Sequence, residues 1–193
     1  MDTRMLLRHL QTYVDFSEEE FSEFIKLFVP FHLKKNAFFY KAGEVPRYSP
    51  FIVKGCLIQY YTTQEGEERI VRIIEENEWA GQIGSMRSNI PTDLYLKTYE
   101  DCELLGITIE NADYGMDHFP AYRKFFSKKY PFDHARLLQE ANRIKSDTPE
   151  NLYMWLMEER PSLILRVPQH YIANYLGIRT ETISRIRKKM TQQ

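Results

Sequence analysis

The clearest chemical signal in this sequence is a basic segment near its end. Between residues 168 and 193 the chain has five basic residues and one acidic residue, a local charge of +4, whereas the formal net charge of all 193 residues is −1. Clustered cationic side chains can neutralise DNA phosphates, and a helix fits the major groove, where it meets base edges. The segment therefore predicts a local nucleic-acid site rather than a generally basic protein.

The spacing of apolar residues predicts two helices, joined by a tight turn, that position this segment. Gly177 supplies the sharp turn, Ile178 fills the junction, and Thr180 is placed to cap the second helix. Ala173 is small where the two helices would cross closely. The predicted buried positions are Ile172, Ala173, Leu176, Ile183 and Ile186.

The outward side of the second helix holds the predicted DNA contacts. The N-terminal part of such a helix meets base edges, and cations elsewhere hold phosphates without reading sequence. The predicted base-reading residues are Arg179, Thr180, Glu181, Thr182 and Arg185. The predicted phosphate contacts are Arg187, Lys188 and Lys189. The competing interpretation is a helical hairpin with a solvated basic face. The small residue, glycine turn and basic helix, arriving in that order, favour DNA binding.

The chain ahead of this motif begins with two helical patterns and continues as a β-rich region. Residues 3–14 have helical spacing, and Ser17 with Glu20 forms a capping box that predicts a second helix. From residue 31 to about 108, short β-branched and aromatic runs alternate with turn signals, which is typical of a barrel or jelly roll. The predicted strands cover 37–40, 50–53, 56–62, 69–74, 94–99 and 103–107.

After residue 108 the pattern is helical again. Asp117 is predicted to cap a long helix that runs to about Asp147. Pro131 lies inside that span, and the sequence leaves open whether it kinks one helix or separates two. Asp147 or Thr148 as the cap, with Pro149 in the first turn, predicts the start of the following helix.

Composition excludes several classes of protein. The only two cysteines, Cys56 and Cys102, form no C-x-x-C pair, so neither a disulfide framework nor a structural zinc site is expected. No apolar run approaches the roughly 20 residues that span a bilayer, and Met1–Arg4 do not begin a signal peptide. We therefore expect a cytoplasmic protein without a membrane partner.

The segment from Ile172 to Arg187 resembles the DNA-binding signature of the cyclic-AMP receptor protein/FNR (Crp/Fnr) superfamily of bacterial regulators, especially its Bacteroidetes-type members. Residues 51–55 and 77–81 are similar to the β-roll of that family. The resemblance covers nearly the whole chain and implies an α+β fold. Its parts would be a cyclic-nucleotide-binding-like double-stranded β-helix or jelly roll over 1–117, a long dimerisation helix over 118–147, and a winged-helix-like helix-turn-helix domain over 148–193.

This resemblance implies a sequence-specific transcription regulator that binds double-stranded DNA as a homodimer, with RNA polymerase as a further candidate partner. Members of the family commonly read bases through an arginine–glutamate–arginine set. Glu181 and Arg185 match the last two members of the set, whereas Thr180 stands where the first arginine would be. The preferred operator is therefore expected to differ from the family's best-known one.

The effector site departs from the family pattern. Members that bind cyclic AMP use a Gly-Glu pair for the ribose and, ten residues further on, an Arg-Ser pair for the cyclic phosphate. Placing Gly81 on that glycine puts Gln82, Thr92 and Asp93 at the other three positions. Because a phosphate needs cationic donors and Asp93 would repel it, we predict a degenerate pocket without cyclic AMP. No cofactor or metal is expected. The β-roll could bind an unidentified, non-phosphorylated effector or serve only as a structural scaffold, and the sequence leaves both alternatives open.

Two other classes of protein were considered. A cupin-like ligand-binding protein or metal enzyme would need several histidines on barrel strands, and only His32 lies in the β region. No nucleophile elbow or phosphate loop occurs, and two cysteines are too few for an iron–sulfur cluster, so no catalytic residue is predicted. The other class is a protein-interaction regulator with a degenerate DNA head, which would lack salt-dependent DNA affinity.

Overall fold

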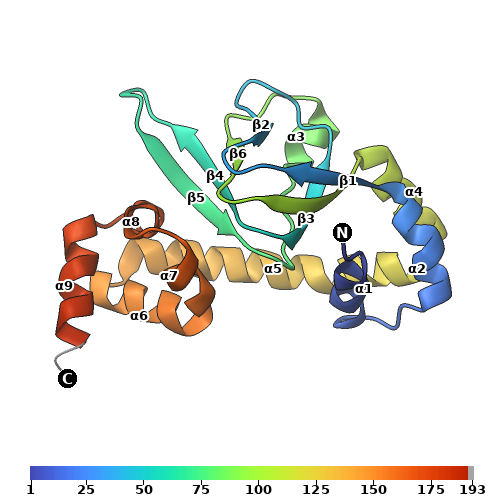
Figure 1. Ribbon diagram of the computed structural model, residues 1–193. Coiled ribbons are helices and arrows are strands. Elements are labelled where there is room, and N and C mark those ends of the chain that lie inside the picture. Colours follow the sequence, from blue (N-terminus) through green and yellow to red (C-terminus); the bar gives the residue numbers. More distant parts are fainter. Residues whose placement is uncertain (191–193) are drawn as a thin grey trace. The chain divides into compact units, whose positions relative to one another are not determined.

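The computed structural model describes residues 1–190 as two compact units, one covering residues 1–131 and the other beginning at Phe132 (Figure 1). The elements of the first unit are α1 (Arg4–Gln11), α2 (Glu18–Phe24), η1 (Ile25–Leu27), β1 (Phe28–Leu33), β2 (Phe38–Tyr40), β3 (Ser49–Lys54), β4 (Leu57–Thr62), β5 (Glu68–Ile74), α3 (Ile83–Ser88), β6 (Tyr95–Thr98), β7 (Cys102–Ile107) and α4 (Ile109–His118). Helix α5 (Pro120–Ser146) begins in this unit and continues into the second. The second unit also holds α6 (Pro149–Glu159), α7 (Pro161–Arg166), α8 (Gln169–Leu176) and α9 (Thr180–Met190).

Two antiparallel sheets form the β-rich part of the first unit. One sheet has the strand order β1-β7-β3 and the other the order β2-β6-β4-β5. Pro30 lies in β1, which is an edge strand, where a residue without an N–H does not interrupt the ladder. Strands β4 and β5 form a hairpin, and Gly66 in its turn has a positive φ of 83°, which such turns favour.

Strands β3 and β7 of the three-stranded sheet are buried on both faces, whereas the edge strand β1 is partly exposed. Phe51, Val53 and Leu105 belong to one core cluster with α1, α2 and the start of α5, whereas Ile52 and Leu104 belong to a second cluster with the other sheet. Successive side chains of a strand point to opposite faces, so strand β3 is buried over five consecutive residues. An N-terminal jelly roll of this kind, followed by helices, confirms the predicted α+β class.

The structure corrects several local predictions. Strand β1 and helix α3 were not predicted from the sequence. Asp117 does not cap a helix, because it lies within α4, which begins at Ile109 under a cap from the Thr108 side chain. Pro131 does not separate two helices, since α5 continues through it. The strands predicted over residues 37–107 and the hydroxyl cap of Thr148 are confirmed. None of the helices within residues 1–190 is both long enough and apolar enough to cross a bilayer.

Candidate nucleic-acid interface

Helices α8 and α9 are joined by a three-residue turn that begins at Gly177. Gly177 has φ 67°, a conformation that glycine adopts without steric cost, and its N–H donates to the Asn174 carbonyl at 3.1 Å. The N–H of Ile178 donates to the Ala173 carbonyl at 2.9 Å. These two bonds close α8 and fix the direction in which the chain enters α9.

The buried faces of α8 and α9 agree with the sequence pattern. Ile172, Ala173, Leu176, Ile183 and Ile186 are all at most 3% exposed, as predicted. Helix α6 adds three further buried residues, one of which is Tyr153. Burial raises the pKa of the Tyr153 phenol, and the nearby Arg187 guanidinium partly offsets this increase. The second helix is therefore held by packing against both α6 and α8.

The start of α9 differs by one residue from the prediction. The Arg179 carbonyl accepts from the N–H groups of Thr182 at 3.0 Å and Ile183 at 3.4 Å, so Arg179 occupies the N-cap position. Thr180 is the first residue of the helix rather than its cap. This places Arg179 beside the positive end of the helix dipole, which favours an anion.

The predicted DNA contacts lie mostly on the exposed side of this helix. The exposed members are Arg179, Glu181, Arg185, Arg187, Lys188 and Lys189. Thr180 and Thr182 are half-buried. The structure thus brings the base-reading and phosphate candidates together on one short helix, with the cations Arg187, Lys188 and Lys189 in its last turn.

One polar residue of this unit was missed from the sequence. Gln169, the first residue of α8, donates from Nε2 to the Thr180 carbonyl at 2.8 Å and to Ser184 Oγ at 2.7 Å. Both acceptors belong to α9. Gln169 is therefore a positioning residue that ties the start of one helix to the first turns of the other. A lone glutamine after a proline gave no sequence signal for this contact.

The residues of the predicted degenerate pocket are engaged in packing and hydrogen bonds of the first unit. A Cβ on Gly81 would lie 2.1 Å from Ser49 Oγ, so only glycine fits there. The Tyr40 hydroxyl accepts from Gln59 Nε2 at 2.7 Å, and Gln82 lies near it. Tyr40 and Gln59 are 3% and 2% exposed. The roll interior beside Gln82 is thus occupied by the protein's own polar side chains.

The other two residues of that pocket lie in the loop before β6. Thr92 is buried, and its backbone pairs with the turn at Gly43 and Glu44 through bonds of 2.8 and 2.9 Å. Asp93 is exposed. His32, the lone histidine of the β region, is exposed on β1.

Comparison with known proteins gives a family-model match for the β-rich region and a fold likeness over most of the chain. Residues 30–113 match the family model of the cyclic nucleotide-binding domain. No curated protein sequence matches the chain.

Several solved structures resemble the chain over most of its length. The c-di-GMP responsive global regulator CLP of Xanthomonas campestris has a TM-score of 0.70 at 14% identity, covering 91% of this chain and 92% of that one. A CooA mutant from Carboxydothermus hydrogenoformans has a TM-score of 0.71 at 20% identity, covering 91% and 81%. A protein named as a transcriptional regulator of the crp/fnr family from Eubacterium rectale has a TM-score of 0.65 at 16% identity, covering 92% and 84%. At these identities the likeness establishes the fold.

Proposed function

We propose that this chain is a sequence-specific DNA-binding transcription regulator of the Crp/Fnr type that works in the cytoplasm. The observation that carries the proposal is helix α9, which is anchored by buried Ile183 and Ile186 and exposes Arg179, Glu181 and Arg185. A helix supported in this way can enter the major groove with its N-terminal half against base edges. The titles of the structural relatives, which include a global regulator and a crp/fnr regulator, support this interpretation. We also propose that the chain is of the Bacteroidetes type, because the sequence from Ile172 to Arg187 resembles the DNA-binding signature of those members.

In this proposal the exposed residues of α9 divide into two groups. Arg185 and Glu181 read bases with help from Arg179, Thr180 and Thr182. The three cations Arg187, Lys188 and Lys189 hold phosphates, so they add salt-dependent affinity without sequence choice. A protein-interaction module with a degenerate DNA head would lack that affinity.

The proposed assembly is a homodimer formed through α5. Tyr130, Leu137, Ala141 and Ile144 are separated by seven, four and three residues, which is the heptad spacing of a coiled-coil seam. Tyr130 is 68% exposed and Leu137 is 38% exposed. A second copy would cover this stripe and would place two recognition helices in successive major grooves, roughly 34 Å apart.

The dimer seam can be tested with one charged substitution. Leu137→Asp would bury a carboxylate against its symmetry mate, so we expect a dimer by light scattering for the unaltered chain and a monomer for the variant. Gln139→Asp adds the same charge at an exposed position of α5 away from the stripe and should leave the dimer intact. A dimer that survives Leu137→Asp would contradict this seam.

We further propose that the protein does not respond to cyclic AMP. The support is Gln82, which supplies no carboxylate and lies near the buried Tyr40, and the exposed Asp93. The hydrogen-bonded pair of Tyr40 and Gln59 would have to separate before a nucleotide could enter beside it.

The test is selection from a random DNA pool at low and moderate salt, with and without cyclic AMP. Enrichment of a two-fold symmetric motif without the nucleotide is expected. On that motif, Arg185→Ala should weaken binding by about 1–3 kcal/mol and relax the sequence preference. Lys188→Ala should weaken motif and random DNA equally and should reduce the salt dependence. Equal losses on motif and random DNA for Arg185→Ala would contradict its base-reading role.

A further inference from the structure

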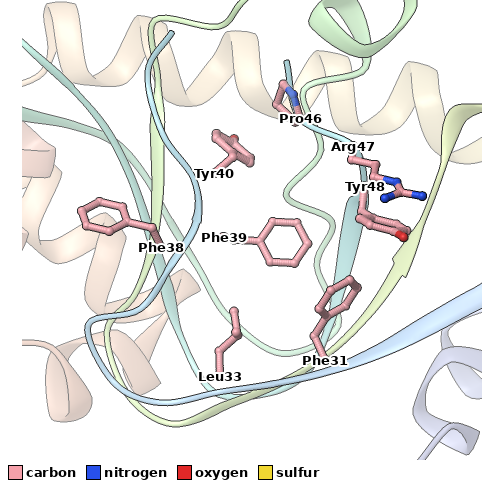
Figure 2. Close-up of a pocket in the computed structure, with 8 residues that line it drawn as sticks. All are labelled: Phe31, Leu33, Phe38, Phe39, Tyr40, Pro46, Arg47 and Tyr48. Carbon is pink, nitrogen blue, oxygen red and sulfur yellow. The ribbon is translucent and has the colours of Figure 1, made fainter. Parts of the chain in front are cut away.

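A cavity of about 300 Å³ opens in the first unit at the seam between β1 and β2, which are edge strands of the two sheets (Figure 2). It is lined by Phe31, Leu33, Phe38, Phe39, Tyr40, Pro46, Arg47 and Tyr48. Most of these side chains are aromatic or aliphatic, and one is cationic. The volume lies at the lower end of the roughly 300–1,000 Å³ that is usual for small-molecule sites.

The aromatic walls of the cavity are braced against one another. Phe31 contacts Phe39 and Tyr48 edge-on, with ring centroids 5.3 and 5.1 Å apart. Gly106 makes this arrangement possible, because a Cβ there would lie 2.6 Å from the Phe31 ring and 3.1 Å from the Cβ of Tyr48. The cavity thus depends on packing that is already formed, which favours binding without reorganisation.

Cations surround the aromatic rim. The Nζ atoms of Lys41 and Lys97 lie 5.0 and 5.6 Å from the centre of the Phe38 ring, and the Arg47 guanidinium lies 5.4 Å from that of Tyr48. Lys41 and Arg47 are exposed, so their charged ends can move to meet a ligand. An apolar interior with a cationic rim matches a molecule with a hydrophobic body and one anionic end.

We propose that this cavity binds a small hydrophobic carboxylate. The hydrocarbon part lies among Phe31, Phe39 and Tyr40, and the carboxylate pairs with Arg47 at the rim. The Tyr40 ring forms one wall, while its hydroxyl accepts a hydrogen bond from Gln59 and lies near Gln82, the residue that directly precedes α3. A ligand that shifts this ring therefore changes the surroundings of Gln59 and Gln82, so the site can serve as an effector site. That regulatory role rests on the proposed DNA-binding function, whereas the binding itself does not.

Binding is tested on the full chain without DNA. Calorimetry and ligand-observed NMR would compare 3-phenylpropionate with 3-phenylpropionamide, which has the same body but no charge. We expect the acid to bind and the amide to bind about tenfold more weakly, because the amide loses the charged hydrogen bonds at the rim. Arg47→Gln should remove that preference. Absence of binding by both compounds, or equal binding, would overturn the proposal.

The position of the site is tested by filling it. Leu33→Trp places a large ring in the cavity and should abolish binding. Val71→Trp is the matched control, since Val71 is 37% exposed on β5 and is not among the residues that line this cavity, and it should bind normally. Circular dichroism confirms that each variant is folded, and loss of binding in Val71→Trp alone would place the ligand elsewhere. The regulatory part is tested by DNA affinity with and without the acid. A ligand that binds the cavity and leaves DNA affinity unchanged refutes the effector role, and a chain without DNA affinity refutes the proposed function separately.

Discussion

Replacing Gln169 by leucine isolates the two hydrogen bonds that tie α8 to α9. Leucine keeps the approximate size of the side chain but has no donor, so the Thr180 carbonyl and Ser184 Oγ both lose a partner. A hydrogen bond contributes about 0.5–1.5 kcal/mol net, and the contact with Ser184 is exposed. We therefore expect Gln169→Leu to lower the free energy of opening α8 and α9 by about 1–2 kcal/mol. Ser184→Ala removes only one bond and should lower it by about 0.5–1 kcal/mol.

The double variant separates positioning from general loss of stability. Once Gln169 is gone, Ser184→Ala removes nothing further, so the two changes should be non-additive by about 0.5–1 kcal/mol. Amide hydrogen exchange of α8 and α9 is the appropriate measurement, because it reports local opening in a chain with two compact units. On DNA, Gln169→Leu should reduce the preference for the selected motif more than the affinity for random DNA. Additive effects, or an unchanged motif preference, would refute the positioning role of Gln169.

Two further predictions concern backbone geometry and pH. Gly177→Ala should lower the free energy of unfolding by about 1–2 kcal/mol, because φ is 67° but nothing lies within 4 Å of the new Cβ. Gly55→Ala should lower it further, because its Cβ would lie 2.5 Å from Cys102 Sγ. Chemical denaturation of the two variants measures both effects. Equal costs would contradict this account. Burial raises the pKa of Tyr40 to about 12, although the Gln59 hydrogen bond and the Arg72 charge act to lower it. The folded chain therefore holds that proton more tightly than the unfolded chain, so the contribution is complete below about pH 10 and is lost as the pH rises towards 12, by about 2–3 kcal/mol. Unfolding measured across that range should show a smaller decline for Tyr40→Phe, and an identical decline would assign the effect to other groups.

Most helices and strands of the fold could be predicted from patterns of neighbouring residues. The apolar run within Ser49–Lys54 and the turn at Gly66 each express a preference of a few consecutive residues, so strand and turn could be predicted from the local sequence. The same holds for the buried face of Ile183 and Ile186. Strand β1 was not predicted because Pro30 is compatible only with an edge strand. The residues of a strand do not reveal whether it will lie at the edge of a sheet. Asp117 was misassigned because Thr108 offered an earlier cap of the same kind.

The sequence by itself therefore determined the α+β class, the tight turn at Gly177 and the residues that α9 exposes, since periodicity and local charge are properties of neighbouring positions. Tertiary structure alone decided which polar groups meet. Gln169 reaches Ser184 only because α8 and α9 cross, and Gln59 reaches Tyr40 only because β4 and β2 lie on either side of β6. The same is true of the cavity between β1 and β2, which exists because Gly106 leaves room for the Phe31 ring. Hydrogen bonds and cavities are set by three-dimensional distances, and these follow from how all the elements pack rather than from the spacing of residues along the chain.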